Sequence, residues 1–150
     1  MNRILVTGAS GFIGRNLLLV APHSWDIVAL YNRSADFVHF VSANNLTNVR
    51  PVKVDLLRQE DIEKVSGFYD LGFHLAGNTD PTLSAIDPRA DLLNNSCATV
   101  NLLEKCHFEK LVYFSSGAVY DGLSGRVTPT LGLNPTLPYA VSKLACEQYV

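Results

Sequence analysis

Cysteine, histidine and net charge are all scarce in this sequence, and each shortage narrows the possible function. The three cysteines, Cys97, Cys106 and Cys146, are odd in number, widely spaced and never arranged as Cys-x-x-Cys. That pattern favours reduced, buried thiols over disulfides or a metal centre. The four histidines show no metal-ligand spacing either. A net charge of −2 offers no electrostatic surface to nucleic acid or to an anionic membrane. We therefore expect a cytoplasmic protein with no metal, nucleic-acid or membrane partner.

Long apolar runs are absent as well. No stretch is long enough to span a bilayer, and the chain opens directly on a strand pattern where a signal peptide would stand. The 150 residues, with 47% hydrophobic and 17% charged side chains, are typical of one globular domain with a substantial core. The sequence contains no internal repeat and no low-complexity segment.

Short apolar runs alternate along the chain with segments of helical pattern. The predicted strands are residues 3–6, 26–30, 49–54, 71–75 and 110–115. The predicted helices are residues 12–20, 59–65, 88–106 and 139–150. Residues 34–48 are ambiguous between a short helix around 37–41 and a loop, and residues 121–138 form a long predicted loop of the kind that often carries function. Nearly all-apolar strands separated by helices indicate an α/β fold with a parallel sheet covered on both faces.

The most informative segment is the turn Thr-Gly-Ala-Ser-Gly-Phe-Ile-Gly at residues 7–14, between the first strand and the first helix. Gly8 would let the turn bend sharply, Gly11 would let the backbone approach a phosphate, and Gly14 would let the helix pack on the strand. The helix N-terminus adds unpaired N–H donors that favour an anion. Because the glycine spacing differs from Gly-x-Gly-x-x-Gly, the turn alone leaves an ordinary tight turn open as the alternative.

A second set of residues ends the fifth strand and begins the last helix. Tyr139 and Lys143 are four residues apart and would share one helix face. An ammonium beside a phenol favours the phenolate, so such a phenol can act as acid or base near neutral pH. A serine at the carboxyl end of the strand, Ser115 or Ser116, could hold a substrate oxygen, because ligands bind at that edge of open α/β sheets.

These motifs, in this order, resemble the extended short-chain dehydrogenase/reductases, and among them the nucleotide-sugar epimerase/dehydratase branch. The resemblance covers essentially the whole chain and rests on residues 7–14, Asp55-Leu56, His74-Leu75-Ala76-Gly77, Asn95-Ser-Cys-Ala-Thr99 and Tyr139-x-x-x-Lys143. It implies a Rossmann-type, doubly wound parallel sheet with strand order 3-2-1-4-5. It also implies an NAD(P)-dependent oxidoreductase or epimerase that acts on a nucleotide-linked sugar and is a homodimer in its full-length form.

The resemblance assigns one set of residues to the cofactor. The glycine turn would hold the pyrophosphate, Asp55 and Leu56 would border the adenine, and the segment after the fourth strand would line the nicotinamide-side ribose. Two alternatives stay open: Asp55 could only cap the turn after the third strand, and the last segment could be a plain strand end. The full set is Gly8, Gly11, Phe12, Ile13, Gly14, Asn32, Arg33, Asp55, Leu56, Leu75, Ala76, Gly77, Tyr139 and Lys143.

The resemblance assigns catalysis to Ser116, Tyr139, Lys143 and Asn95. Ser116 matches the position of the catalytic hydroxyl, with Ser115 as its competitor. Tyr139 would be the acid/base, and Lys143 would hold the nicotinamide ribose and tune the phenol. Asn95 would order a helix bend and a water near the lysine. The alternative is that Asn95 is a solvated polar residue like its neighbour Asn94.

The sequence departs from the family pattern at the end of the second strand. NAD-preferring members place an acidic residue there to bind the ribose 2′-hydroxyl, whereas this chain has Tyr31, followed by Asn32 and Arg33. With no carboxylate to repel a 2′-phosphate and a guanidinium able to pair with it, NADP is favoured over NAD. Asp36 lies too late to replace the missing carboxylate, and Arg33 could instead be a solvated loop charge.

Two other departures bear on the reaction. Gly117-Ala118 stands where dehydratases often place an Asp-Glu pair, which argues against a typical dehydratase. Family members are also considerably longer, and the last helical pattern runs into Val150 without a C-cap, so we expect a dinucleotide-binding domain over 1–150 that is cut within its last helix. A carbonyl reductase for a non-sugar substrate and a catalytically silent dinucleotide sensor remain alternatives.

Overall fold

The structure, a computed structural model, describes residues 2–150, which divide into two compact units. Of the described residues, the first unit comprises 2–76 and Asn101–Phe114, and the second comprises Gly77–Val100 and Ser115–Val150. The prediction of a single domain over residues 1–150 stays a prediction.

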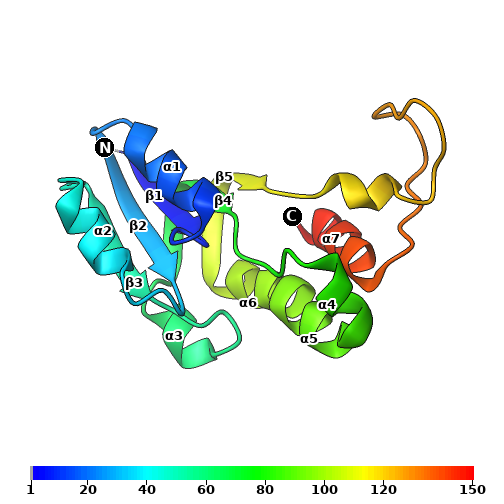
Figure 1. Cartoon of the computed structure of the whole chain (residues 1–150). Helices are drawn as coiled ribbons and strands as arrows, with labels where there is room; N and C mark the ends of the chain where they lie inside the picture. Colours follow the sequence, from blue (N-terminus) through cyan, green and yellow to red (C-terminus); the bar gives the residue numbers. More distant parts are fainter. Residues whose placement is uncertain (1) are drawn as a thin grey trace. The chain divides into compact units, whose positions relative to one another are not determined.

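The first unit is built on a five-stranded parallel sheet (Figure 1). Its strands are β1 (Asn2–Thr7), β2 (Trp25–Tyr31), β3 (Val49–Lys53), β4 (Gly67–His74) and β5 (Cys106–Tyr113). Their order is β3-β2-β1-β4-β5, which confirms the predicted order 3-2-1-4-5. Ile4 of β1 lies opposite Ile27 of β2 and Leu71 of β4, so the most apolar strands form the buried centre of the sheet.

Two helices cover one face of this sheet and bury its main apolar cluster. They are α1 (Phe12–Val20), which has the predicted bounds, and α2 (Phe37–Ala43), so the helical interpretation of the ambiguous segment is confirmed. Leu18 of α1 and Phe37 of α2 pack with residues of β1 and β2 that alternate toward this face. The members of this cluster are Ile4, Val6, Ala9, Leu18, Ile27, Ala29, Phe37, Val41, Leu46 and Val49.

Two further segments complete the first unit: the short helix α3 (Gln59–Glu63) and residues 101–105 of α6 (Ala98–Lys105). Ile62 and Leu102 from these segments are fully buried. The Asn101 side chain of α6 contacts the loop before α3 by donating from Nδ2 to the Leu56 carbonyl over 2.9 Å.

The predicted bounds of the last two strands are wrong. β4 begins four residues before residue 71, and β5 occupies Cys106–Tyr113 where 110–115 was predicted. β5 is an edge strand in which exposed residues are interspersed with buried or partly buried ones, and its first five residues include His107, Glu109 and Lys110. Its pairing with β4 starts at Gly67 and Cys106, a long-range contact that an apolar run does not reveal.

The second unit is helical. It contains α4 (Pro81–Ile86), α5 (Pro88–Leu92), the π-helical turn η1 (Leu93–Cys97), residues 98–100 of α6, the 3₁₀ turn η2 (Gly117–Tyr120) and α7 (Pro138–Tyr149). Residues 121–137 form no helix or strand, as predicted. The predicted continuous helix over 88–106 is wrong, because η1 separates α5 from α6 and α6 ends at Lys105.

The sequence also did not predict α4. Its start is marked by Asp80, whose carboxylate accepts hydrogen bonds from the backbone N–H groups of Thr82 and Leu83 over 2.8 and 3.1 Å. Pro81 occupies the first helical position. The pair Asp-Pro is therefore a helix-start signal here, and Asp87-Pro88 repeats it at α5.

No helix among residues 2–150 is long and apolar enough to cross a membrane.

Candidate functional site

The carboxyl edge of the sheet carries the glycine turn in a conformation that requires glycine. Gly8 has φ +63°, and a Cβ there would lie 2.7 Å from the backbone nitrogen of Ala76. A Cβ on Gly14 would lie 2.6 Å from the Cα of Ala9, so this glycine lets α1 pack directly on the turn. The Gly11 N–H donates to the Gly8 carbonyl over 3.0 Å and closes the turn.

The turn opens onto an uncapped helix N-terminus. Gly11 is the N-cap of α1 and provides no side-chain hydrogen bond to the first-turn N–H groups. Phe12 and Ile13 at this end are 84% and 49% exposed, a high exposure for large apolar side chains. Free N–H donors and the positive end of the helix dipole suit a phosphate group. The residues present therefore fit the pyrophosphate of a dinucleotide.

Thr7 and His74, at the ends of β1 and β4, hold the two neighbouring loops together. The Thr7 hydroxyl and His74 Nδ1 form a buried hydrogen bond of 2.6 Å. Thr7 Oγ1 also accepts from the backbone N–H groups of Leu75 and Ala76 over 3.2 and 3.1 Å. Leu75 and Ala76, both predicted to line the cofactor, are thus fixed against the glycine turn.

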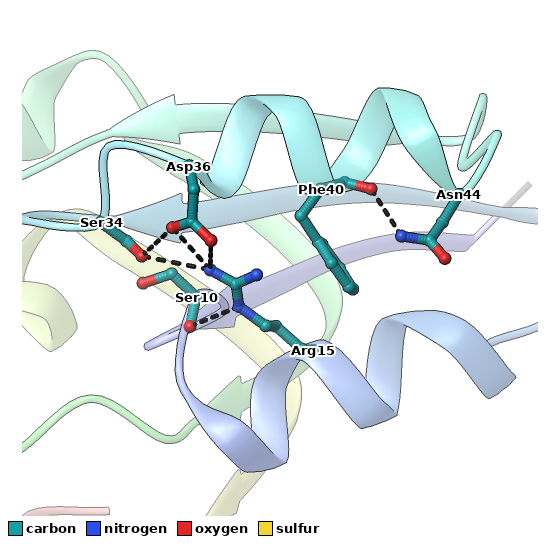
Figure 2. A network of polar contacts seen from close by, with 6 residues as sticks. All are labelled: Ser10, Arg15, Ser34, Asp36, Phe40 and Asn44. Atoms are coloured by element: carbon teal, nitrogen blue, oxygen red, sulfur yellow. Dashed lines mark hydrogen bonds and ion pairs between the residues drawn. The ribbon is translucent and has the colours of Figure 1, made fainter.

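The segment after β2 contains a polar network centred on Arg15 of α1 (Figure 2). The Arg15 guanidinium donates to the Ser10 carbonyl over 2.9 Å, to Ser34 Oγ over 3.2 Å and to both carboxylate oxygens of Asp36 over 2.9 Å. Its cation also lies 4.7 Å from the centre of the Phe40 ring. The hydrogen bond from Ser34 and the guanidinium of Arg15 lower the pKa of the Asp36 carboxyl. The first acid after β2 is therefore already paired within the protein.

Asn32 and Arg33 precede this network and are both exposed. The Arg33 guanidinium makes no ion pair with any residue in the part of the chain that the structure describes.

The two predicted adenine-side residues lie just after β3. Asp55 is partly exposed, and its Oδ1 accepts from the Leu57 N–H over 3.0 Å, which is the turn-capping contact considered as the alternative role. Leu56 is largely buried, whereas the next residue, Leu57, is 38% exposed.

In the second unit the two serines have different partners. The Ser115 hydroxyl donates to the carboxylate of Glu147 on α7. Ser116 is the N-cap of η2, and its Oγ accepts from the Ala118 N–H over 3.2 Å. An accepted hydrogen bond leaves the Ser116 O–H free to donate elsewhere, whereas the Ser115 O–H is already used.

Tyr139 and Lys143 lie one helical turn apart near the start of α7, and both are nearly buried, at 8% and 7% exposure. Ser84 of α4 anchors this turn, because its Oγ accepts from the Tyr139 N–H over 3.1 Å. Burial lowers the pKa of Lys143, while the nearby Cys146, Asp91 and Glu147 act in the opposite direction. The side chains predicted for acid/base catalysis are thus shielded from water.

Asn95 lies in η1 and is 2% exposed, so it is not the solvated residue that the alternative described. Its Oδ1 accepts from the Asn78 N–H over 2.8 Å, and its Nδ2 donates to Asp91 Oδ1 over 2.9 Å. A Cβ on Gly77 would lie 2.7 Å from Asn95 Oδ1, so Gly77 gives this amide room. The Asn95 carbonyl accepts from the Thr99 hydroxyl over 2.8 Å.

Four positioning residues were not assigned roles from the sequence: Thr7, His74, Ser84 and Asp91. Thr7 and His74 belong to the glycine-turn motif and to the His-Leu-Ala-Gly motif. Their position at the ends of neighbouring strands could have indicated that they contact each other. Asp91 could have been noticed as a lone acid on the buried side of a helical pattern. Ser84 gave no signal, because α4 itself was not predicted.

The family model of the NAD dependent epimerase/dehydratase family matches residues 4–150. The UDP-glucose 4-epimerase of Mycolicibacterium smegmatis is 35% identical over 161 residues, an alignment that covers 99% of this chain and 50% of the relative. The chain spans about half the length of the curated relatives it matches.

Solved structures with a similar fold include two complexes with a nicotinamide dinucleotide. The UDP-glucuronic acid 4-epimerase of Bacillus cereus in complex with NAD has a TM-score of 0.81 and 28% identity, covering 98% of this chain and 50% of that one. RMD from Pseudomonas aeruginosa complexed with NADPH has a TM-score of 0.74 and 28% identity, covering 99% of this chain and 48% of that one. The chain belongs to the NAD dependent epimerase/dehydratase family.

Proposed function

We propose that the protein containing this chain moves a hydride between a nicotinamide dinucleotide and a nucleotide-linked sugar, with Tyr139 as the acid/base. The observation that carries this proposal is the pair Tyr139 and Lys143, one turn apart on α7 and almost fully buried. A lone Tyr-x-x-x-Lys on a helix is usually an exposed face. Burial of both polar side chains is costly and needs a reason.

The cofactor role rests on the glycine turn and the open N-terminus of α1, together with the relatives' complexes with NAD and NADPH. When bound, the nicotinamide would accept a hydride from a carbon of the sugar. In the first unit, the N–H groups at Phe12 and Ile13 would bind the pyrophosphate, while Leu75 and Ala76 would border the adjoining ribose. Asp55 would face the adenine, in addition to its contact with the Leu57 N–H.

The acid/base role uses three groups of the second unit. Ser116 would donate its O–H to the substrate oxygen, because its Oγ otherwise only accepts a hydrogen bond. Tyr139 would take the hydroxyl proton as the hydride leaves. Lys143 would stabilise the phenolate by its charge and donate to the ribose hydroxyls. Asn95 would hold the helix bend of η1 and the loop at Asn78 in place for these groups.

A nucleotide-linked sugar is the proposed substrate because the relatives named above as UDP-glucose and UDP-glucuronic acid 4-epimerases carry such sugars in their names. Gly117-Ala118 after Ser116 favours an epimerase or reductase over a dehydratase. The protein would be a homodimer acting in the cytoplasm. Mixing the protein and cofactor with UDP-sugars, and separately with simple ketones, tests the substrate class. Turnover of ketones alone would overturn it.

We also propose a preference for NADP over NAD. Asp36 is held by Arg15 and Ser34, so it is not free to bind a ribose 2′-hydroxyl, whereas the neighbouring Arg33 is exposed. A charge-assisted contact from Arg33 to a 2′-phosphate contributes about 1.5–3 kcal/mol, or roughly ten- to a hundred-fold in affinity.

Calorimetric titration of NAD and NADP into the unmodified chain and into Arg33→Ala tests this preference. We expect NADP to bind more tightly and Arg33→Ala to remove most of the difference. Arg50→Ala is the matched control, because Arg50 is an exposed arginine in the body of β3 and should leave the ratio unchanged. Equal affinities in the unmodified chain, or an unchanged ratio in Arg33→Ala, would contradict the assignment.

A further inference from the structure

The loop that follows β3 is held from two sides by side chains outside the proposed cofactor set. It begins at Asp55, at the same carboxyl edge of the parallel sheet as the glycine turn. From α3, Asp61 Oδ2 accepts from the Asp55 N–H over 2.9 Å. From α6, Asn101 Nδ2 donates to the Leu56 carbonyl over 2.9 Å. The Leu57 N–H donates to Asp55 Oδ1 over 3.0 Å. Three consecutive residues of this loop are therefore fixed by hydrogen bonds.

Asn101 is an unfavourable residue for its position in α6. Asparagine is a weak helix former, because its short polar side chain competes for nearby backbone groups. Asn101 nevertheless lies inside the eight-residue helix, and its amide donates to a different segment. The next residue, Leu102, is fully buried and anchors this part of the helix, so the amide reaches Leu56 from a fixed element. The contact with the loop therefore explains an asparagine where alanine would suit the helix better.

Asp61 makes a similar contact from α3. One carboxylate oxygen accepts from the Asp55 N–H, and the other accepts from the Lys64 ammonium. The hydrogen bonds from Lys64 and from the Asp55 N–H lower the pKa of the Asp61 carboxyl. The group is therefore an ionised carboxylate near neutral pH, which is a strong acceptor for the loop N–H.

One oxygen of Asp55 is left for a ligand. Oδ1 accepts from the Leu57 N–H, whereas Oδ2 accepts from no residue in the part of the chain that the structure describes. Asp55 is partly exposed, as a ligand contact requires. A carboxylate accepts hydrogen bonds and donates none, so it suits a base with an amino group and opposes a base with a carbonyl oxygen in the same place. Adenine has such an amino group, and hypoxanthine has a carbonyl oxygen instead.

We propose that Asn101 and Asp61 are positioning residues for the adenine end of the cofactor: by fixing residues 55–57 they direct Asp55 Oδ2 at the adenine amino group, so that the site selects adenine over hypoxanthine. This inference rests on the proposed function for the place of Asp55 in the cofactor site. Neither positioning side chain touches the base. Without them, the Asp55 carboxylate would have to be ordered when the dinucleotide binds, and the discrimination between the bases would fall.

The test compares two dinucleotides that differ only in the base. NADP and nicotinamide hypoxanthine dinucleotide phosphate are titrated separately into the unmodified chain and into Asn101→Ala by calorimetry. We expect the unmodified chain to bind NADP roughly ten-fold more tightly or better, because a hydrogen bond to a charged group distinguishes the two. In Asn101→Ala this ratio of affinities should fall by roughly three-fold or more. A side chain that only supported the fold would weaken both dinucleotides equally and leave the ratio unchanged.

Asn44→Ala is the matched control. Asn44 is an exposed asparagine of the same unit, and its amide donates to the Phe40 carbonyl of α2 over 2.8 Å (Figure 2). This variant loses the same kind of contact far from the loop in sequence and should keep the ratio of the unmodified chain.

Asp61 provides a second, independent pair of variants. Asp61→Ala removes the acceptor of the Asp55 N–H and should lower the ratio as Asn101→Ala does. Asp61→Asn keeps an amide oxygen that can accept from the same N–H, so it should retain the ratio of the unmodified chain. If Asn101→Ala does not fold, this pair decides the question.

An unchanged ratio in Asn101→Ala or in Asp61→Ala would overturn the proposal, as would equal affinities for the two dinucleotides in the unmodified chain. Binding of neither dinucleotide would overturn it together with the cofactor site. The proposed reaction is tested separately. If Tyr139→Phe kept full turnover while Asn101→Ala lost the discrimination between the bases, the proposed function would fail and the adenine site would stand.

Discussion

Replacing Asn95 by alanine should destabilise the protein far more than replacing its neighbour Asn94. Asn95→Ala removes two hydrogen bonds, the one accepted from the Asn78 N–H and the one donated to Asp91 Oδ1. It leaves the buried Asp91 carboxylate with Asn78 Nδ2 as its one hydrogen-bond donor among residues 2–150. Asn94 is exposed, and its amide donates only to the Ala90 carbonyl at the helix surface.

The magnitude follows from what is left unpaired. A hydrogen bond contributes about 1 kcal/mol net, and removing one partner of buried polar groups costs about 1–3 kcal/mol, so Asn95→Ala should lose about 3 kcal/mol. For a chain of this length that corresponds to a decrease in Tm of about 6–12 °C. Asn94→Ala is a surface substitution and should change the free energy of unfolding by less than about 0.5 kcal/mol.

Urea unfolding followed by far-ultraviolet circular dichroism measures both variants beside the unmodified chain. The slope of the transition should stay the same, so that the midpoint alone reports stability. Equal losses in the two variants would refute the reasoning, because they would mean that the buried cluster of Asn78, Asp91 and Asn95 contributes no more than a surface contact.

Two further predictions concern Gly8 and Cys106 of the first unit. Gly8→Ala should lose stability and dinucleotide affinity, because a Cβ there would clash with the backbone of Ala76. Gly125 also has a positive φ but lies in open space, so Gly125→Ala should cost only the backbone strain of about 1–3 kcal/mol. Thermal unfolding and calorimetry should show the larger loss for Gly8→Ala, and equal losses would contradict the clash. Burial raises the pKa of the Cys106 thiol from 9.0 to about 11, so its contribution to stability is complete below pH 9 and is lost as pH rises toward 11. The urea midpoint should therefore fall more between about pH 8 and pH 10 in the unmodified chain than in Cys106→Ala, and parallel curves would show that Cys106 does not contribute.

The parallel sheet could be predicted because the sequence repeats one physical pattern, whereas the strand order followed from the family resemblance. Each central strand is an apolar run, and a parallel sheet with helices on both faces is the arrangement that buries such runs completely. The bounds of the edge strand β5 could not be predicted well, because half of its residues are exposed. Its sequence therefore lacks the continuous apolar run that marks the central strands.

The second, helical unit contains a helix break that a local sequence pattern does not predict. The apolar residues of 88–106 fit one continuous helix, yet the chain forms α5, η1 and α6. The π turn depends on Asn95, which contacts Asn78 from a distant loop, and on Thr99, whose hydroxyl occupies the Asn95 carbonyl. Such long-range polar contacts have no periodic signature.

In the candidate site, too, residues with a local sequence signal differ from residues that depend on long-range contacts. Gly8, Tyr139 and Lys143 could be proposed as site residues from the sequence, because the proposed chemistry needs those residue types at those spacings. Asp91 and Ser84 were not, because each contacts a partner on another element: the Asn95 side chain of η1 for Asp91, and the Tyr139 backbone of α7 for Ser84.

The most direct test of the central claim is the single-turnover rate of nicotinamide reduction when the protein with bound cofactor is mixed with a nucleotide-linked sugar. We expect absorbance of the reduced nicotinamide to appear with the unmodified protein. In Tyr139→Phe it should appear about 10²- to 10⁴-fold more slowly, because the substitution removes the acid/base hydroxyl and keeps the buried ring. Cofactor affinity should remain close to that of the unmodified protein. A Tyr139→Phe variant that reduces its cofactor at the unmodified rate would contradict the account.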